Sequence, residues 1–482
     1  MTTTTDYDTL YLDGGWAKPT GTGTITVTSP STETIIGSVP EATDHDVDKA
    51  VDASRTEFED PEGWAHYAPA RRAEILERFA DALESRASRT AEAVSQQNGM
   101  PIQIANGFEA VFPALLLRYY AGLVKDSTDE RRPAMFGGTT IVRREPVGVV
   151  AAIVPWNFPQ ALAFTKIAPA LAAGCTVVMK PSPETVLDSY VMAEAAIAAG
   201  LPAGVLNIVP ADATVGAYLV AHPGVDKVAF TGSTAAGRNI AEVCGRLLRP
   251  VTLELGGKSA AVVLDDADLG SRLEQFFSAT LLNNGQTCFL STRVLAPRNR
   301  YNDIVDTISD FAKSLTVGDA LDPNTQIGPM ASAKQRDRVE SYISKGVSDG
   351  ARITTGGDRP ADLDRGFFVS PTVFSNVDNG HTIAQEEIFG PVLAVIPYDD
   401  VDEAIRLAND SDYGLGGSVW SEDPQRALEV AKRIRTGSIG INSYVNDPVS
   451  PFGGIKASGL GREMGPEGLA GFQQLKSVYQ AP

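Results

Sequence analysis

The segment that decides the fold opens with Pro146-Val-Gly-Val-Val-Ala-Ala-Ile-Val154, an apolar run that stops at the breaker Pro155-Trp-Asn-Phe-Pro159. A helical pattern over Leu162–Ala173 follows, and Cys175–Met179 is the next strand-like run. Short β-branched runs that alternate with helices of about ten residues are typical of right-handed βαβ units. The alternation continues to Val251–Leu255, so the segment predicts a parallel sheet whose ligands lie beyond the carboxyl ends of its strands.

Further elements of the same kind fill this segment and continue after it. Up to residue 255 we expect helices at Val186–Ala199, Thr214–Ala221 and Ala235–Leu247 and strands at Val205–Val209 and Lys227–Thr231. A second alternation has strands at Ala260–Leu264, Arg293–Ala296, Val392–Ile396 and near Ile353 and Val373, and helices at 272–283, Tyr301–Ser314, Ser332–Asp349 and Val401–Asn409. The break at Gly256-Gly257 is the expected boundary between two α/β units.

The flanks of these units show weaker patterns. Residues 1–40 are typical of short strands and turns. Apolar spacing of three and four residues then predicts helices over Asp44–Phe58, Pro69–Gln97 and Phe108–Leu123. The stretch Pro451–Pro466 is rich in Gly and Pro and predicts a loop, and Gly471–Tyr479 predicts a final strand.

Composition excludes several classes of protein. The chain has 482 residues, of which 43% are hydrophobic, so disordered and fibrous proteins are excluded. Its 60 acidic and 41 basic residues give a formal net charge of −19. This balance argues against a surface for nucleic acid or anionic membrane, and the acidic surface is explained by solubility.

Cysteine and histidine usage indicates a reducing compartment and no metal. Three cysteines are too few for a disulfide scaffold in a chain of this length, so we expect a cytoplasmic protein. The four histidines lie far apart and there is no CxxC motif, so no zinc site is expected. The N-terminus has no basic or apolar signal region, and the apolar stretch Ile167–Met179 is too short to span a bilayer.

Three residues have surroundings that favour catalysis. Cys288 follows an apolar helix in the small polar loop Asn284-Gly-Gln-Thr-Cys288, where a nucleophile is displayed, although a lone cysteine is usually a small buried hydrophobe. Glu254 ends an apolar strand, where burial raises a carboxyl pKa and suits a general base; the alternative is a salt bridge to Lys258. Asn157 stands on a proline-braced turn, either as a donor for an oxyanion or simply as a turn residue.

Two other sites have the features of nucleotide binding. Lys180 ends the strand Cys175–Met179, and Phe230-Thr-Gly-Ser-Thr-Ala-Ala-Gly237 is a strand that runs into a glycine-bearing helix start. Such a helix N-terminus can receive a phosphate oxygen. The chain contains no GxGxxG motif, and glycine at a tight βα turn is the simpler explanation of this pattern taken alone.

Taken together, these segments resemble one family. Pro155-Trp-Asn-Phe-Pro159, Phe230-Thr-Gly-Ser-Thr234, Leu253-Glu-Leu-Gly-Gly-Lys258 and Gly285-Gln-Thr-Cys288 occur in the order that they have in the aldehyde dehydrogenase superfamily. Glu386-Glu-Ile-Phe-Gly-Pro391 and Pro451-Phe-Gly-Gly454 match it further on. The resemblance covers nearly the whole chain, and it implies a hydrolytic, NAD(P)-dependent aldehyde dehydrogenase.

The resemblance assigns roles to the three candidate catalytic residues. Cys288 would attack the aldehyde carbon to give a thiohemiacetal, whose oxyanion the Asn157 side chain and the Cys288 backbone N–H would hold. Loss of hydride to the nicotinamide would leave a thioester. Glu254 would activate the water that hydrolyses this thioester, and it would help to deprotonate the thiol.

The resemblance also implies the cofactor site. Lys180 would lie near the adenosine ribose, the small residues of Gly232–Gly237 near the pyrophosphate, and Glu387 and Phe389 at the nicotinamide ribose and ring. The complete set of implied cofactor residues is Ile153, Pro155, Trp156, Lys180, Ser182, Glu184, Phe230, Gly232, Ser233, Gly237, Leu255, Gly256, Glu387 and Phe389. No metal is implied.

One departure from the family bears on the choice of dinucleotide. Many NAD-preferring members have an acid three residues after the lysine, where it accepts both ribose hydroxyls. Pro183 occupies that position here and Glu184 follows one position later, which relaxes the exclusion of a 2′-phosphate. No additional arginine near Lys180 offers a phosphate clamp, so NAD is the expected cofactor and NADP the alternative.

The substrate pocket is implied by four aromatic positions, Phe158, Phe289, Tyr444 and Phe452, which line the tunnel in this family but which core packing would also explain. The loop Val445-Asn-Asp-Pro-Val-Ser450 has no arginine or lysine to hold a distal carboxylate. We therefore expect an apolar or aromatic aldehyde and not a dicarboxylic semialdehyde.

The expected fold is α/β, with a Rossmann-like parallel-sheet cofactor domain, a second α/β catalytic domain and a small β oligomerisation arm. Residues 1–124 and 147–256 would form the dinucleotide-binding domain, and residues 257–450 the catalytic domain. Residues 125–146 and 467–482 match the arm that joins subunits in the family, which implies a homodimer or homotetramer.

Three other functions remain as alternatives. A CoA-acylating relative would pass the acyl group to a thiol, but such relatives generally lack the carboxylate found at Glu254. A catalytically silent dinucleotide-binding relative would keep the fold and lose turnover, against which the three candidate residues argue. A cysteine protease or esterase would need a histidine base, and no histidine lies in any of the motifs.

Overall fold

The first of two large sheets is doubly wound. The computed structural model describes residues 4–481, and this sheet has the strand order β20-β12-β11-β8-β9-β10-β2-β3. The strands from β12 to β10 are parallel, and β20, β2 and β3 join them antiparallel. Their bounds are β2 Leu10–Leu12, β3 Gly15–Ala17, β8 Val149–Ile153, β9 Thr176–Lys180, β10 Leu206–Ile208, β11 Lys227–Thr231, β12 Val251–Glu254 and β20 Gly459–Leu460.

Helices cover both faces of this sheet because its central strands are apolar on both sides. In β8, Val150 and Ala152 pack into one core while Val149 and Ala151 pack into another. The first core contains α2 Pro69–Glu84, α5 Phe112–Lys125, α6 Pro159–Ala173 and α7 Leu187–Ala199; the second contains α1 Asp44–Glu59, α8 Ala213–Ala221 and α9 Thr234–Arg246. This is the arrangement that buries a parallel sheet completely.

The second large sheet repeats this plan. Its strand order is β15-β16-β17-β14-β13-β18-β19, and only β15 is antiparallel to its neighbour. The strands are β13 Ala260–Val263, β14 Arg293–Pro297, β15 Arg352–Thr355, β16 Thr372–Ser375, β17 Val392–Tyr398, β18 Gly417–Trp420 and β19 Gly440–Ile441. One face carries α10 Leu273–Thr280 and α11 Tyr301–Ser314, and the other carries α12 Ala333–Ser348, α13 Thr382–Gln385, α14 Val401–Asn409 and α15 Pro424–Ala431.

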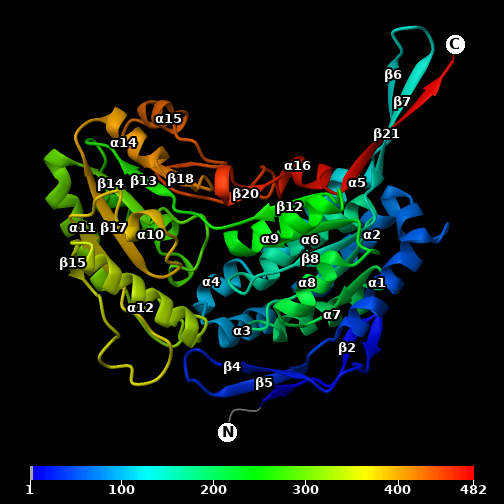
Figure 1. Ribbon diagram of the computed structural model, residues 1–482, viewed down its shortest axis with the longest axis horizontal. Coiled ribbons are helices and arrows are strands. Elements are labelled where there is room, and N and C mark those ends of the chain that lie inside the picture. Colours follow the sequence, from blue (N-terminus) through cyan, green and yellow to red (C-terminus); the bar gives the residue numbers. More distant parts are fainter. Residues whose placement is uncertain (1–3, 482) are drawn as a thin grey trace.

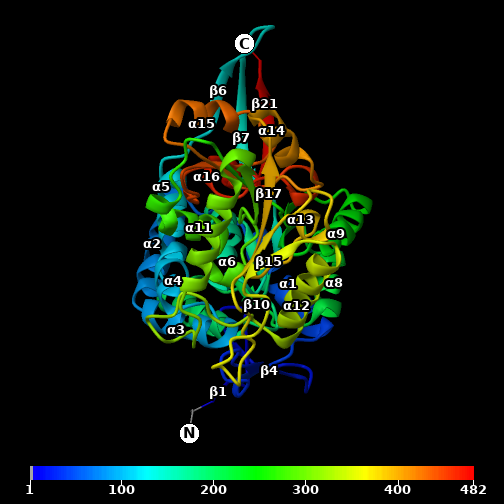
Figure 2. The same ribbon diagram turned by 90° about the vertical axis from the view of Figure 1, so that its left-hand side faces the viewer.

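Two small sheets complete the fold. One consists of β1 Thr5–Asp6, β5 Ile35–Pro40 and β4 Thr24–Thr28. The other forms an arm from β6 Glu130–Pro133, β7 Thr139–Pro146 and β21 Gln473–Gln480, which projects from the body in both views (Figures 1 and 2). Short helices α3 Ala87–Asn98, α4 Ile102–Gly107 and α16 Gly465–Ala470 lie between these elements in the chain. The predicted α/β class, with two mainly parallel sheets, is confirmed.

Three element predictions were wrong in detail. The helix expected over Pro69–Gln97 breaks after Glu84, because the Ser85 hydroxyl and the Arg86 guanidinium both donate to the Ala82 carbonyl that a continuing helix would use. The helix expected from Phe108 begins at Phe112, after a turn. The stretch Pro451–Pro466 is not all loop, since β20 within it pairs with β12 and ties this late segment to the first sheet.

The stretch Ile102–Lys125 has the length and apolar composition of a helix that could cross a membrane. Half of its most apolar window is buried inside the protein. Its second part, α5, packs against α2 and α6 and contributes Leu116, Leu117 and Tyr120 to the core. Burial of this kind is what the core helix of a globular protein shows.

Candidate active site

Cys288 lies in a strained loop between α10 and β14. The preceding residues Asn283, Asn284 and Gly285 have φ values of 52°, 61° and 74°, a left-handed conformation that costs free energy for residues other than glycine. Gly285 is required here, because a Cβ would lie 2.2 Å from the carbonyl carbon of Gly390. The loop presents Cys288 with its side chain partly exposed, whereas Cys175 and Cys244 are buried.

Side-chain amides hold this loop in place. Asn284 donates from Nδ2 to the Gly99 and Pro329 carbonyls at 2.9 and 3.0 Å, and its Oδ1 accepts from the Gly328 N–H at 2.6 Å. Asn283 donates to the Asn157 carbonyl at 2.9 Å. These bonds offset the cost of the left-handed backbone, and they connect the Cys288 loop to the turn after β8.

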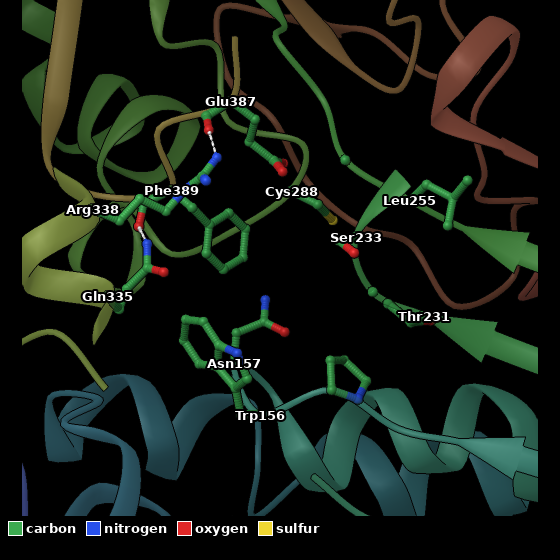
Figure 3. A pocket seen from close by; sticks show the side chains of 13 residues that line it. Trp156, Asn157, Thr231, Ser233, Leu255, Cys288, Gln335, Arg338, Glu387 and Phe389 are labelled. Carbon is green, nitrogen blue, oxygen red and sulfur yellow. Dashed lines mark hydrogen bonds between the residues drawn. The ribbon is translucent and has the colours of Figure 1, made fainter. Parts of the chain in front are cut away.

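Asn157 points its side-chain amide into the cavity that Cys288 also lines (Figure 3). Its Nδ2 donates to the Gln286 carbonyl at 2.9 Å, two residues before Cys288. The Asn157 carbonyl accepts a second amide bond from Asn98 at 3.3 Å, in addition to the bond from Asn283. The residue is therefore fixed by three residues from two separate segments, as an oxyanion donor must be.

Glu254 ends β12 with a buried carboxyl group. Neither carboxyl oxygen has a hydrogen-bond partner among residues 4–481, and the predicted alternative of an ion pair with Lys258 is not formed among them. Burial raises the pKa of Glu254 well above its usual range, and the neighbouring Glu463 raises it further, while Lys166 and Arg462 oppose this shift. A carboxyl group with a raised pKa and a free oxygen is suited to accept a proton near neutral pH.

The neighbours of Glu254 were missed from the sequence. Glu463 forms a fully buried ion pair with Lys166 at 2.8 Å, and Lys166 also donates to the Thr231 hydroxyl at 2.6 Å. Lys166 could have been found, because it is the only charged residue of the apolar helix α6, where a cation is costly unless it is paired. Glu463 stands in a glycine-rich loop and gave no such signal.

The first cavity, of about 270 Å³, runs along the carboxyl ends of β8, β11 and β12. It brings together eight of the predicted cofactor residues with two catalytic candidates and three residues that were not predicted. Its lining is Pro155, Trp156, Asn157, Thr231, Gly232, Ser233, Leu255, Gly256, Cys288, Gln335, Arg338, Glu387 and Phe389 (Figure 3). This is the edge at which a parallel sheet binds its ligands.

The walls of this cavity fit a dinucleotide. Ser233 is the N-cap of α9, so the start of that helix faces the cavity and can receive a phosphate. Glu387 accepts the Gly257 N–H at 2.9 Å and lies against Gly256, where a Cβ would come within 2.6 Å of its Oε2. Burial raises the pKa of Glu387 to about 6, so the carboxylate is available to ribose hydroxyls at neutral pH.

Two residues of α12 hold the segment that carries Glu387 and Phe389 by hydrogen bonds to its backbone. Arg338 donates to the Glu387 carbonyl at 2.6 Å and Gln335 donates to the Phe389 carbonyl at 2.7 Å (Figure 3). The Phe389 ring meets the edge of Trp156 across the cavity at 5.4 Å between centroids. Arg338 and Gln335 are one turn apart on α12, and no motif marked them in the sequence.

Six of the predicted cofactor residues do not line this cavity: Ile153, Lys180, Ser182, Glu184, Phe230 and Gly237. Lys180 is buried and donates to the Pro181 and Ala211 carbonyls at 2.9 and 2.7 Å, and burial lowers its pKa to about 8. Glu184 is exposed and accepts a hydrogen bond from Ser182. These three residues lie at the end of β9, the neighbour of β8 in the sheet.

A second cavity, of about 60 Å³, meets the first at Asn157 and Cys288. Phe158, Phe289 and Phe452 line it as predicted, and Phe108, Phe112, Leu162, Leu282 and Met464 are further apolar residues that were not predicted. The remaining lining is Ala161, Thr165, Thr287, Asn446 and Glu463. Among the residues that the structure describes, this lining contains no arginine or lysine.

Tyr444 lies behind this second cavity and not in its lining. Its ring stacks on Phe289 at 4.4 Å between centroids, and its hydroxyl pairs with that of Ser438 at 2.6 Å. Tyr444 instead lines a third cavity of about 260 Å³, which shares Asn446, Phe452 and Met464 with the second. The third cavity is therefore a larger, more polar neighbour of the narrow aromatic one.

The thiol of Cys288 is the reactive group common to the first two cavities. Burial raises its pKa, and the carboxylates of Glu387 and Glu254 raise it further, so the thiol is neutral in the free protein. Cys288 and Asn157 line the same open volume, whereas Glu254 is not in the lining of either cavity and acts on the Cys288 thiol through its charge. A sulfur nucleophile, a fixed amide donor and a nearby carboxyl base are the set needed for acyl chemistry on a carbonyl carbon.

The chain is similar to known proteins over nearly its whole length. A model described as "Aldehyde dehydrogenase family" matches residues 16–478. A geranial dehydrogenase from Castellaniella defragrans is 55% identical over 477 residues, which cover 99% of each chain. A 3-succinoylsemialdehyde-pyridine dehydrogenase from a Pseudomonas species is 42% identical, with 98% of each chain covered.

Solved structures show the same similarity. The crystal structure of an aldehyde dehydrogenase from Mycobacterium tuberculosis complexed with NAD+ superposes with a TM-score of 0.97 at 47% identity, covering 99% of each chain. An NAD+ complex of an aldehyde dehydrogenase from Bacillus cereus has a TM-score of 0.95 at 38% identity, covering 98% of this chain and 96% of that one.

Proposed function

This chain belongs to the aldehyde dehydrogenase family, and we propose that it oxidises an apolar or aromatic aldehyde to the carboxylic acid. It is an aldehyde-oxidising oxidoreductase that uses a nicotinamide dinucleotide. The observation that carries the proposal is the position of the Cys288 thiol, which forms part of the wall of both the large cavity and the aromatic cavity.

Cys288 is the proposed nucleophile. The thiol first gives up its proton, for which Glu254 is the proposed acceptor and solvent the final one. The sulfur then attacks the aldehyde carbon, and the carbonyl oxygen takes up the negative charge of the thiohemiacetal. The Asn157 amide and the Cys288 backbone N–H are the proposed donors to this oxygen, and the amide is supported by its fixed position on the cavity wall. After oxidation the acyl group remains on sulfur as a thioester.

Glu254 is the proposed base for hydrolysis. It would take a proton from the water that attacks the thioester carbon, and the sulfur would then leave as the thiolate. Its unpartnered oxygens and raised pKa support this role. In the buried Glu463–Lys166 pair, Glu463 would favour the protonated form of Glu254 and Lys166 the ionised form.

The large cavity is the proposed dinucleotide site. When bound there, the cofactor accepts a hydride from the aldehyde carbon. Glu387 would receive the ribose hydroxyls, Trp156 and Phe389 would enclose the ring, and Ser233 with Gly232 would receive the pyrophosphate. Lys180, Ser182 and Glu184 would hold the adenosine end, outside the large cavity. NAD is supported by the NAD+ complexes of similar structures, and NADP remains the alternative because Pro183 replaces an acid.

The aromatic cavity is the proposed aldehyde site. Its phenylalanines and its lack of lysine or arginine among the described residues favour an apolar substrate over a dicarboxylic semialdehyde. The name of the geranial dehydrogenase relative supports the same class, since geranial is an apolar aldehyde. Phe158, Phe289 and Phe452 would contact the substrate, with Tyr444 supporting Phe289 from behind.

The remaining features of the proposal concern the whole protein. Residues 1–124 and 147–256 would form the dinucleotide-binding domain, residues 257–450 the catalytic domain, and residues 125–146 and 467–482 the oligomerisation arm. The arm would join a homodimer or homotetramer, and the enzyme would be cytoplasmic, with no nucleic-acid or membrane partner. The exposed Met135, Phe136 and Tyr479 on the arm support its role as an interface.

The test is a dehydrogenase assay at 340 nm with NAD and NADP across aliphatic, aromatic and terpenoid aldehydes, together with succinic semialdehyde. We expect turnover with the apolar aldehydes, free acid as product, and none with Cys288→Ala. Turnover confined to the semialdehyde would overturn the substrate assignment, and acyl-CoA formed on addition of CoA would overturn hydrolysis.

A further inference from the structure

A buried pair of acids lies directly behind the Asn157 turn, outside the machinery described above. Glu109 stands in the turn between α4 and α5, and Asp188 in the first turn of α7; they are 1% and 2% exposed. Gln160 connects them, because its backbone N–H binds Glu109 and its side-chain amide binds Asp188 at 2.7 Å. No arginine, lysine or histidine of residues 4–481 forms an ion pair with either acid.

Glu109 caps helix α6 from a distant part of the chain. Its Oε2 accepts the Gln160 N–H at 2.7 Å and the Ala161 N–H at 3.4 Å. The first N–H groups of a helix need an external acceptor, and the N-cap residue Phe158 provides no side-chain bond. The capped helix start follows Asn157 immediately, so the bond fixes the backbone that carries the amide donor.

The segment around Glu109 also forms one wall of the aldehyde cavity. Phe108 and Phe112 flank Glu109 in sequence and line that cavity, and Phe108 meets the Phe158 ring edge-on at 5.9 Å between centroids. The opposite wall comes from Phe158 and Ala161 at the start of α6. The Glu109 bonds therefore join two walls of the cavity beside the reacting carbon.

The environment indicates that Glu109 carries a proton at neutral pH. Burial, with a smaller contribution from Asp188, raises the pKa of Glu109 to about 8, against the two helix N–H groups that lower it. Burial raises the pKa of Asp188 to about 6, and hydrogen bonds from Gln160 and Gln97 oppose this shift. A neutral carboxyl keeps an oxygen for the helix N–H groups without placing a second charge beside Asp188.

We propose that Glu109 is a positioning residue for the reaction: its carboxyl oxygen, bonded to the start of α6, holds the Asn157 turn and the aromatic wall in register around the aldehyde carbon. The inference rests on the proposed function, since it acts through Asn157. This role requires an acceptor oxygen at the present distance from the N–H groups of α6, and it does not require a negative charge. A glutamine, which keeps both the reach and the acceptor, should therefore replace Glu109.

The test compares Glu109→Gln, Glu109→Ala and Glu109→Asp with a control, Asp46→Ala. Asp46 is also fully buried and accepts backbone N–H bonds, from Thr20 and Thr43, at the start of α1 on the other side of the sheet. We expect kcat to fall about 10- to 100-fold in E109A, in line with the effect of misplacing a catalytic group by about 1 Å. E109Q should stay within about threefold of wild type, and D46A should lose thermal stability but keep its kcat.

Two further measurements distinguish positioning from general damage. The Kd for NAD+, measured by calorimetry, should change little in E109A, and cofactor-free hydrolysis of a p-nitrophenyl ester by Cys288 should fall with kcat. If E109A does not fold, E109D replaces it, because it keeps the carboxyl group but withdraws the oxygen by one methylene; it should be slow while E109Q is fast.

Three outcomes overturn the inference: wild-type kcat in E109A, an equal loss in D46A, or E109Q as slow as E109D. An inactive wild-type enzyme would instead contradict the proposed function, so the two failures are distinguishable.

Discussion

Cys288 combines an accessible sulfur with an environment that keeps its proton in place. Burial and the nearby carboxylates of Glu387 and Glu254 raise the thiol pKa, and a neutral thiol is a poor nucleophile. The free protein should therefore alkylate slowly at this residue, and removal of a nearby negative charge should increase the rate.

Glu387→Gln tests this electrostatic effect. We expect the variant to react with iodoacetamide at pH 8 about two- to tenfold faster than wild type, since one pKa unit changes the thiolate fraction about tenfold. Mass spectrometry of the peptide that contains Cys288 measures the rate. Glu386→Gln is the matched control, because Glu386 is exposed and bonds to Tyr342. Equal alkylation rates in wild type, E387Q and E386Q would contradict the inference that Glu387 raises the pKa of the Cys288 thiol.

The raised pKa of Glu109 predicts how stability depends on pH. The unfolded chain loses this proton near pH 4.5 and the folded chain near pH 8. Between these values the folded state binds more protons than the unfolded state. The contribution of protonated Glu109 to the stability of the folded state is therefore complete below pH 4.5 and is lost as the pH rises towards 8. The melting temperature of E109Q relative to wild type should therefore increase from pH 5.5 to pH 8.

Differential scanning calorimetry at several pH values measures this difference. Asp188 faces Glu109, also has a raised pKa and remains in both proteins, so its effect cancels in the comparison. A difference in melting temperature that stays constant over this range would show that Glu109 titrates normally.

Single residues could be predicted from sequence where they violate a local rule. Glu254 stands in an apolar strand, and Cys288 in a small polar loop, and each is unusual within its own few residues. Glu109 and Glu463 could not be found in this way. Their partners Gln160 and Lys166 lie in α6, far away in the sequence, and nothing local to either acid marks it as buried.

At the scale of elements, the loop before Cys288 depends on one glycine. Gly285 has a φ of 74°, and a Cβ there would overlap the Gly390 carbonyl. Gly285→Ala should move the loop and reduce kcat by at least about tenfold, because the sulfur would be misplaced relative to Asn157.

Gly122→Ala is the control for this substitution. Gly122 is an exposed helical residue of α5, and a Cβ added there would have no neighbouring atom within 4 Å. Alanine should therefore stabilise the protein by up to about 1 kcal/mol and leave kcat unchanged. Steady-state kinetics and thermal unfolding of the two variants provide the comparison. An active G285A enzyme would show that the loop tolerates the shift.

Helices and strands were predicted with correct bounds where the hydrophobic periodicity of a segment and its length indicate the same type of element. The strand Lys227–Thr231 and the helices Tyr301–Ser314 and Val401–Asn409 have the bounds expected from the sequence. The break at Ser85 was missed because it depends on side-chain bonds to one carbonyl, which no periodicity reveals. The strand β20 was missed because two residues between glycines become a strand only when β12 lies beside them.

On the scale of the whole molecule, the site exists only where the two large sheets meet. Asn157 and Glu254 follow strands of the first sheet, whereas Cys288 and Glu387 belong to loops of the second. The return of β20 to β12 ties the segment after the second sheet back to the first. Sequence motifs could identify these site residues one by one along the chain. The packing of the two sheets against each other, which brings the residues together, does not follow from any local sequence pattern.

The arm carries several large apolar side chains that are exposed in the single chain. Leu475 and Tyr479 lie on the same face of β21 and are 69% and 80% exposed. If this face joins subunits, Leu475→Asp should shift the protein towards monomers, as measured by size-exclusion chromatography with light scattering. Gln474→Asp, on the opposite face of the same strand, is the control; an oligomer unchanged by both substitutions would contradict an interface here.

The linings of the large cavity and the aromatic cavity share Asn157 and Cys288 and are otherwise made of different residues, and this has a consequence for kinetics. An aldehyde held among the phenylalanines and a dinucleotide held in the large cavity would occupy different volumes. The shape of the free protein thus imposes no compulsory order of addition. A dead-end analogue of the aldehyde should compete with aldehyde and yet be non-competitive against the dinucleotide.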